Sequence, residues 1–410
     1  MRGAGDDLRI GERVAFYRRR RGMSQRVLGD LVNRSEDWVG KVERGARDIR
    51  RIDVIAELAR ALRVEMGDLL GQPVLVEDER QDDDVPAIRD ALMTPRRLSR
   101  TLFRTSLPRN GMLSPDNSAR LVEQYWTDYQ RGKLGQVISA MPGLIRTAQE
   151  LEDAATSTSR QGWAVSARTH HLATTTLSKI GEADLAWIAA ERAMHAADQA
   201  DDPLVLASAA RAGTHALLAS GRFNDAVELG NAAAEWMRPQ LAKDDPAALS
   251  LLGMLRLRTA VAAARDNDRP AATDLIARAE RAAQQLGEDA NYWHTGFGPT
   301  NVELHRISTH LDLGDIDHVV RVGPSVRTEG VPAERRVSHM IDVARALSLV
   351  AKDDDATQLL LEAEVIAPHL VRHSPVVRET VKSLYRRSSP AAKPSTTPLG
   401  SLAERCRAIS

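Results

Sequence analysis

The sequence predicts an all-α protein, in which a small helical domain precedes an α-solenoid built from pairs of helices. Three observations lead to this expectation. The alternation of apolar and polar residues that is typical of strands is nearly absent from the 410 residues, and aromatic residues make up only 4%. Apolar residues instead recur at helical spacing. In the longer C-terminal part, proline and glycine mark helix starts and stops at a regular interval.

Four helices and one short helical turn are expected in residues 1–72. Ser24 and Ser35 stand where N-caps are expected for the second and third helices. A serine hydroxyl there accepts a hydrogen bond from a free amide of the first turn. The fourth helix carries its apolar residues between 52 and 62, and the closing turn covers 64–70.

Two short helices joined by a few residues form a helix-turn-helix pattern within this domain. The stretch RGMSQRVLGDLVNRSEDWVGKVERGAR, residues 21–47, resembles the helix-turn-helix of the Cro/phage-repressor (XRE) family. The Ser-Gln start of the second helix, the KVERG end of the third and the LARALRV close of the domain match over roughly 65 residues. The resemblance implies a five-helix domain that binds double-stranded DNA.

The resemblance also implies roles for individual residues. In this family the third helix meets base edges, and its flanks meet phosphates. The implied base-reading residues are Ser35, Glu36, Asp37, Trp38 and Lys41, the implied phosphate contacts are Gln25, Arg44 and Arg47, and Arg18 and Glu43 match an ion pair between the first and third helices.

Two acids open the third helix, where family members more often carry Gln, Ser, Thr or Arg, and two explanations are open. At the first and second helical positions, Glu36 and Asp37 complement the helix dipole by about 0.3–1 kcal/mol each. Alternatively, one of them accepts a hydrogen bond from the N4 amine of cytosine in the major groove. Lys41 is the favoured guanine contact, whereas Trp38 suits either the core or a thymine methyl group. Affinity then comes mainly from the arginines.

Composition sets the remaining boundaries. Residues 73–113 begin with an acidic run and end in a turn-rich stretch, so we expect a linker with one short helix starting at Pro86. Residues 114–387 are expected to form the solenoid. Residues 388–410 are rich in Pro, Ser and Thr, and they are expected to be a disordered tail.

Prolines that open helices reveal the period of the solenoid. Their gaps are 88, 43, 86 and 43 residues, and in four of five cases Ser or Asp precedes the proline, which is N-cap chemistry. Two further starts are therefore expected near residues 160 and 290. A break, in most units a glycine, divides each unit into two helices, and the units resemble tetratricopeptide (TPR) repeats of unusual length. The prolines are Pro115, Pro203, Pro246, Pro332 and Pro375.

A solenoid of helix pairs curves, so its first helices are expected to line a concave groove. Polar side chains there are costly to bury without partners, which favours contact with water or a ligand, or pairing with one another. The stretch 291–306 is the densest aromatic and histidine cluster. It either packs between repeats or lines a ligand pocket, with Asn301 as a clamp. The candidate effector groove comprises Arg168, His171, Arg211, His215, Asn301 and His305.

The remaining signals limit the chemistry. Cys406 is the only cysteine, so no intrachain disulfide or thiolate metal site can form. No catalytic, cofactor or metal motif appears, and we expect no enzyme activity, cofactor or metal. The formal net charge is zero, although residues 1–72 hold 16 Lys and Arg against 12 Asp and Glu. No apolar run of membrane-spanning length is evident, so we expect a cytoplasmic protein without a membrane partner.

The whole chain resembles actinobacterial regulators that join an XRE domain to TPR-like repeats. This resemblance implies a sequence-specific DNA-binding transcriptional regulator whose TPR-like domain forms a homodimer and senses a peptide, a small molecule or a partner protein. The alternative is a TPR-like interaction scaffold whose helix-turn-helix does not bind DNA. The retained Gln25, the Arg18 and Glu43 pair, and the arginines between 44 and 51 favour DNA binding.

Overall fold

The computed structural model is helical throughout its described part, in which no strand occurs. The prediction of an all-α protein is therefore confirmed. The chain divides between Pro86 and Ala87 into two compact units, which we call the first and the second unit. The described residues are 9–21, 23–47, 49, 52–62, 64, 69, 84–95, 102, 114–154, 160–241, 245–389 and 396–409.

The first unit packs its helices around one apolar core. The hydroxyls of Ser24 and Ser35 each accept a hydrogen bond from the backbone amide of the third residue of the following helix, so both expected N-caps are present. Leu28, Val39 and Leu58 are among the fully buried core residues. The expected turn at 64–70 lies almost wholly outside the described residues. The helices are α1 (Ile10–Arg20), α2 (Gln25–Leu31), α3 (Glu36–Glu43) and α4 (Ile52–Leu62).

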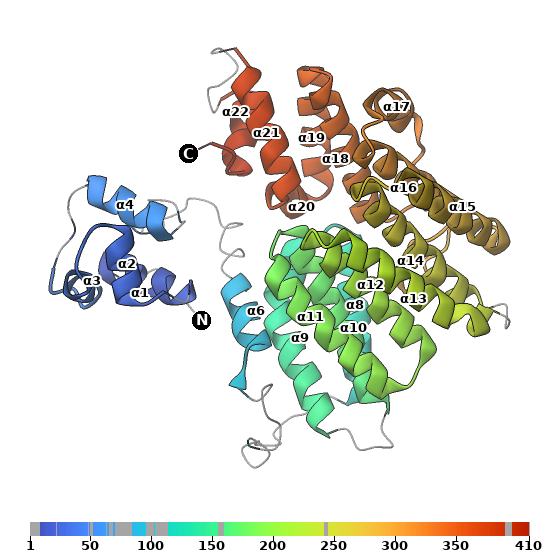
Figure 1. The fold of residues 1–410 in the computed structure, drawn as a ribbon, viewed down its shortest axis with the longest axis horizontal. Coiled ribbons are helices and arrows are strands. Elements are labelled where there is room, and N and C mark those ends of the chain that lie inside the picture. Colours follow the sequence, from blue (N-terminus) through green and yellow to red (C-terminus); the bar gives the residue numbers. More distant parts are fainter. Residues whose placement is uncertain are drawn as a thin grey trace. The chain divides into compact units, whose positions relative to one another are not determined.

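The second unit is a solenoid of helix pairs (Figure 1). Consecutive helices pack as pairs from α8 to α19, and the first helix of each pair also contacts the first helix of the next. Its helices are α6 (Asp84–Leu92, of which the residues from Ala87 on belong to this unit), α8 (Pro115–Gln130), α9 (Leu134–Ala154), α10 (Arg160–Lys179), α11 (Ala183–Ala200), α12 (Pro203–Ala219), α13 (Phe223–Leu241), α14 (Pro246–Arg265), α15 (Arg269–Leu286), η2 (Tyr292–His294), α16 (Pro299–Asp312), α17 (Ile316–Val322), η3 (Gly323–Ser325), α18 (Ala333–Leu349), α19 (Asp353–Ile366), α20 (Pro368–Arg372), α21 (Pro375–Arg387) and α22 (Pro398–Arg405).

The proline signals explain where these helices begin. Four of the five prolines occupy the first helical position after a Ser or Asp whose side chain accepts a backbone amide hydrogen bond. Pro332 instead stands one residue before α18. The start expected near 160 is that of α10, whereas near 290 a loop with a short 3₁₀ turn precedes α16. Left-handed residues separate the two helices of six pairs, at Gly132, Gly181, Gly221, Asn267, Gly314 and Ala351.

The solenoid closes on itself, which the sequence did not indicate. Helix α8 of the first pair contacts α18, and α9 contacts α20. The turns that follow α8 and α10 lie against the C-terminal end of the solenoid. A Cβ on Gly132 would lie 2.8 Å from the Cβ of Ala367, and one on Gly181 would lie 2.6 Å from the Cγ of Pro375. The first helices therefore surround a common polar centre instead of lining an open groove.

The helix expected in the linker is present as α6, and the boundary between the two units falls within it. In α6, Ile88 and Leu92 are fully buried. The backbone oxygen of Ala91 accepts a hydrogen bond from the side chain of Gln149 at 2.8 Å. Ile88 and Leu92 lie four residues apart on one face of α6, and the hydrogen bond from Gln149 joins this part of the helix to α9 in the second unit.

The prediction of a disordered tail at 388–410 is wrong for residues 396–409. Thr397 caps α22, where Leu402 is fully buried, as is Cys406 just beyond the helix. The guanidinium of Arg405 donates to the carboxylate of Glu364 on α19, with an Nη2 to Oε2 distance of 2.6 Å. Composition favoured disorder because Pro, Ser and Thr dominate the segment, but its few apolar residues share one helical face that covers α19 and α21.

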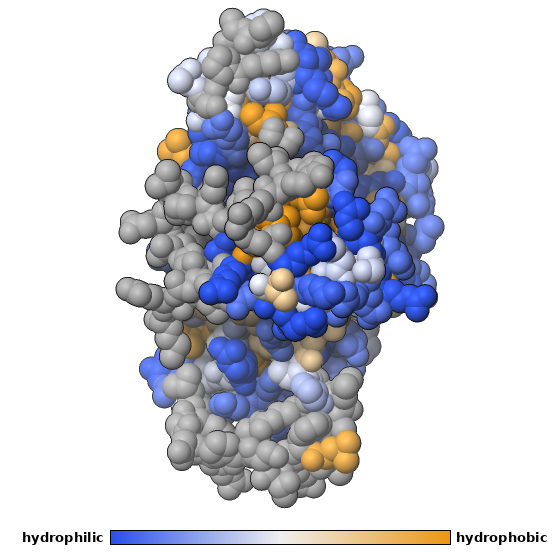
Figure 2. Space-filling view, turned by 90° about the vertical axis from the view of Figure 1, so that its left-hand side faces the viewer, coloured by the Kyte–Doolittle hydropathy of each residue, from blue (hydrophilic) through white to orange (hydrophobic). Residues whose placement is uncertain are grey.

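Helix α14 is long and apolar enough to cross a membrane by length and composition, with a mean hydropathy of 1.4 in its most apolar window. The expectation that no such segment exists was therefore wrong. However, 83% of that window is buried inside the second unit, as in the core helix of a packed solenoid. Where Figure 2 shows described residues, most of the surface is hydrophilic, and hydrophobic residues form separate patches.

Candidate nucleic-acid interface and buried polar centre

Helices α1 and α3 of the first unit are joined by a buried ion pair. The guanidinium of Arg18 donates from Nε to Oε1 of Glu43 at 2.5 Å and from Nη2 to Oε2 at 2.9 Å. Gln25, at the start of α2, donates to the same carboxylate at 2.7 Å. Burial alone would raise the pKa of Glu43, but these hydrogen bonds lower it below its ordinary value. One carboxylate thus fixes three helices, as the family resemblance implies for Arg18 and Glu43.

A close helix contact supports the same arrangement. A Cβ on Gly11 would lie 2.0 Å from the carbonyl oxygen of Val42, so α1 reaches α3 only because residue 11 is glycine. The position of α3 is therefore set by backbone approach as well as by the ion pair.

The first turn and outer face of α3 are exposed. Ser35 is the N-cap, and Glu36 and Asp37 follow it in the first turn. Lys41 forms an ion pair with Asp37, with a distance of 2.7 Å between Nζ and Oδ2. Both acids stand in the first turn, where negative charge complements the helix dipole, and base reading by either of them stays a prediction. Base reading by Lys41 requires it to leave Asp37.

Arginines surround this face. The side chain of Trp38 is half-buried against the core, and the guanidinium carbons of Arg34 and Arg47 lie 5.8 and 6.0 Å from its ring centre. Arg44 and Gln25 both approach Gly40, where a Cβ would lie 3.1 Å from Nη1 and 3.3 Å from Oε1. The structure brings Gln25, Arg44 and Arg47 around α3, and their contacts with phosphate stay a prediction.

In the second unit, the six residues of the candidate effector groove come from α10, α12 and α16. All except the half-buried His215 are buried. The open groove was therefore a wrong expectation, because closure of the solenoid and the loop 291–298 cover the inner face. Two contacts join members of the group to one another, Arg211 with His171 and His305 with the carbonyl oxygen of Asn301, and the other partners lie outside the group.

The loop 291–298 fills the space between repeats. Phe297 is fully buried against α14, where a Cβ on Gly253 would overlap its ring. Asn291 and Gln130 exchange amide hydrogen bonds of 2.8 and 2.9 Å. Asn301 donates from Nδ2 to the carbonyl oxygen of Gly296 at 2.8 Å. The Nδ2 of Asn301 thus holds the loop, while its Oδ1 is buried without a hydrogen-bond partner, and its role as a ligand clamp stays a prediction.

Arg168, His171 and His305 each have a protein partner. Arg168 pairs with Glu123, with an Nη2 to Oε1 distance of 2.5 Å. His171 contacts Ser208 through Nδ1 at 2.8 Å, and Nδ1 of His305 lies 2.9 Å from the carbonyl oxygen of Asn301. Nη1 of Arg168 and Nδ1 of His215 are nevertheless buried without a hydrogen-bond partner, and among the described residues Arg211 forms no ion pair with an acid.

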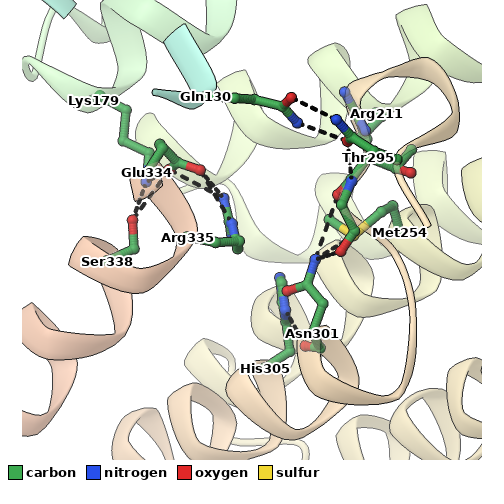
Figure 3. Close-up of polar contacts among 12 residues, drawn as sticks. Gln130, Lys179, Arg211, Met254, Thr295, Asn301, His305, Glu334, Arg335 and Ser338 are labelled. Atoms are coloured by element: carbon green, nitrogen blue, oxygen red, sulfur yellow. Dashed lines mark hydrogen bonds and ion pairs between the residues drawn. The ribbon is translucent and has the colours of Figure 1, made fainter. Parts of the chain in front are cut away.

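A carboxylate that the sequence did not single out organises the centre. Glu334 of α18 is buried and lies 2.7 Å from Nζ of Lys179 and 3.1 Å from Nη2 of Arg335 (Figure 3). Burial alone would raise its pKa, but these cations hold it far below the ordinary value. In the sequence, charged residues such as Arg258 stand inside otherwise apolar first helices. This pattern was the available signal for a polar centre, but it does not show which charged residues pair with one another.

The centre encloses a small cavity of about 30 Å³ for the centres of water-sized molecules. That is room for one or two waters. Arg211, His215, Arg258, Glu334 and Arg335 are among its lining residues. Among the described residues, no group of three His, Cys, Asp or Glu side chains is placed to hold a metal ion.

Acidification is expected to destabilise the second unit through three histidines of its polar centre. Burial, and after it the neighbouring arginines, lower the pKa of His171, His215 and His305 well below the ordinary 6.5. Near pH 6.5 the unfolded chain takes up protons on these histidines and the folded chain does not. The free energy of unfolding is therefore unaffected by them above that pH, and it decreases as the pH is lowered further. Each histidine contributes up to about 1.4 kcal/mol per pH unit.

Chemical denaturation of the second unit between about pH 7.5 and about pH 5.5 checks this expectation. His215→Gln should reduce the slope of stability against pH by up to one proton. An unchanged slope would mean that His215 is not kept neutral by the fold.

Comparison with known proteins identifies the first unit only. Residues 9–71 match a family model described as a helix-turn-helix domain. No curated protein matches the sequence. Among solved structures, the chain matches the crystal structure of Bacillus thuringiensis PlcR in complex with the peptide PapR7 and DNA, at 15% identity and a TM-score of 0.34, covering 68% of this chain and 95% of that one. At that score the likeness supports no conclusion about this chain.

Proposed function

We propose that the chain is a sequence-specific DNA-binding transcriptional regulator. The main support is that α3, within the matched helix-turn-helix domain, presents an exposed polar face. Contacts among Arg18, Glu43 and Gln25 fix this helix to α1 and α2. In this proposal α3 enters the major groove, and the surrounding arginines contact phosphates.

The proposal includes a homodimer held by the second unit. Two copies should then bind a pseudo-palindrome, with half-sites about 10 bp apart from centre to centre or a multiple of that distance. Support comes from the domain type alone, because helix-turn-helix proteins commonly bind symmetric sites as dimers. Size-exclusion chromatography with light scattering, with and without DNA, tests it.

The second unit is proposed to sense a peptide, a small molecule or a partner protein. A ligand regulates DNA binding only through different affinities for two arrangements of the dimer. The buried polar centre supports the proposal, because a closed solenoid with an unevenly charged interior has groups that a ligand can satisfy. Because the polar centre is covered, a peptide reaches it only when the solenoid opens.

Selection of bound sequences from a random DNA library with the full-length chain, followed by gel shifts, tests the DNA-binding proposal. Enrichment of one sequence supports it. Uniform or absent binding would favour the alternative, a TPR-like scaffold whose helix-turn-helix has lost DNA recognition.

Lys41→Ala should weaken binding to the selected site by about 1–3 kcal/mol and relax the preference at one base pair, as expected for the loss of a base contact. Gel shifts on the selected site and its single-base variants measure both effects. The matched variant Arg47→Ala should instead weaken all sequences alike and reduce the dependence on salt. If Lys41→Ala leaves the preference unchanged, another residue of α3 reads the bases.

A further inference from the structure

Two arginines at the centre of the second unit lack an acidic partner. The side chain of Arg211 is 5% exposed. Its hydrogen-bonding contact is a 3.4 Å approach of Nη2 to Nε2 of His171. Within the described residues, no ion pair joins Arg211 or Arg258 to a carboxylate, and Nε of Arg258 is buried without a hydrogen-bond partner. Arg211 is buried and Arg258 is half-buried, and withdrawing a cation from water without a counter-charge is costly.

The nearby acids are already engaged. Glu123 pairs with Arg168, while Glu334 accepts from Lys179 and Arg335. Other partners offset part of the cost, since the guanidinium of Arg211 lies 5.9 Å from the ring centre of Trp126. Positive charge still exceeds negative charge.

The pKa values report this excess. Burial, followed by the repulsion of Arg258 and Arg168, lowers the pKa of Arg211 to about 9. Burial and the repulsion of Arg335 lower the pKa of Arg258 to about 10. Both side chains remain charged at neutral pH, so the centre holds cations that an anion would stabilise.

Both arginines line the same small cavity, together with Arg335 and His215, whose Nδ1 is buried without a hydrogen-bond partner. Guanidinium groups match the geometry of carboxylate and phosphate oxygens, to which they donate paired hydrogen bonds. The cavity admits a compact group only, since it holds about 30 Å³ for the centres of water-sized molecules.

We propose that this cavity, the cationic pocket, binds the oxyanion group of a small ligand, a carboxylate or a phosphate, through Arg211 and Arg258. This proposal names the chemical class of the effector. Only the effect of the bound ligand on DNA binding rests on the proposed function. Binding is therefore tested without DNA, so that failure of DNA recognition and failure of the pocket are separate results.

Thermal unfolding of the full-length chain, with sodium phosphate, sodium acetate or sodium chloride at equal pH and ionic strength, tests the proposal, together with calorimetric titration of phosphate and acetate. We expect a saturable rise of several degrees in the Tm with an oxyanion and not with chloride. A rise with phosphate alone assigns a phosphate, with acetate alone a carboxylate, and with both the shared chemistry. A rise with neither overturns the proposal.

Arg211→Met removes the cation and keeps a long apolar side chain. We expect it to abolish the oxyanion-specific rise and, in chloride, to leave the Tm equal to or above that of the original chain. Arg258→Met provides a second variant if Arg211→Met does not fold. Arg238→Met, which removes an exposed arginine paired with Glu235 on α13, should keep the rise. An oxyanion-specific rise retained in both pocket variants would place binding elsewhere and overturn the proposal.

Discussion

Glu43→Ala is expected to unfold the first unit and thereby to abolish DNA binding. The carboxylate is buried and accepts hydrogen bonds from Arg18 and Gln25, so its removal leaves the guanidinium of Arg18 without its counter-charge. Truncating one partner of a buried ion pair costs roughly 3–5 kcal/mol. A small domain has little stability to lose, because only about 5–15 kcal/mol separates folded from unfolded chains even in larger domains.

Hydrogen exchange of the α1, α2 and α3 amides in the full-length chain measures this effect, with a gel shift on the same sample. The matched variant Glu36→Ala removes an exposed acid of the same helix, and it should leave the protection of these amides unchanged. If Glu43→Ala abolished DNA binding while the amides stayed protected, Glu43 would act through contact with DNA and not through the fold.

The first unit shows how far local chemistry carries a sequence-based prediction. Ser24 and Ser35 were recognisable as caps because an N-cap depends on its own hydroxyl and amides two or three residues away. The pairing of Arg18 with Glu43 came from the family resemblance, since nothing local requires residues in two helices to meet. The contact between Asp37 and Lys41 was missed, although their spacing of four residues on one helix predicts it.

The repeat period was predictable for the same reason. Proline at the first helical position and a left-handed residue between paired helices are local requirements, and both recur in the structure. Closure of the solenoid was not predictable, because it depends on small differences of angle that accumulate over many pairs. Closure turned an expected open groove into a buried centre, and it brought Glu334 next to Lys179.

The tail and the loop show where composition misleads. Thr397 and the apolar residues of α22 outweigh the polar composition around them, because a few side chains on one face suffice to dock a short helix. Next to the loop, Nδ2 of Asn301 bonds to the backbone of Gly296, five residues away, and composition does not reveal this local contact.

Glu334→Gln is expected to destabilise the second unit strongly. It keeps the shape of the side chain and removes its charge, which leaves Lys179 and Arg335 without compensation beside Arg211 and Arg258. Loss of one partner from a buried charged group costs roughly 3–5 kcal/mol. Because the folded chain holds the pKa of Glu334 far below 4.5, its contribution is complete above that pH and is lost as the pH falls further.

Chemical denaturation at neutral pH measures the loss, and a double-mutant cycle identifies its cause. Adding Lys179→Met to Glu334→Gln should recover part of the stability, because one of the uncompensated cations is then removed. The control Glu303→Gln neutralises a half-exposed acid paired with Arg306 on α16 and should have little effect. If the double variant were less stable than Glu334→Gln alone, the loss would come from packing around residue 334, and the charge balance of the polar centre would not be what stabilises the closed solenoid.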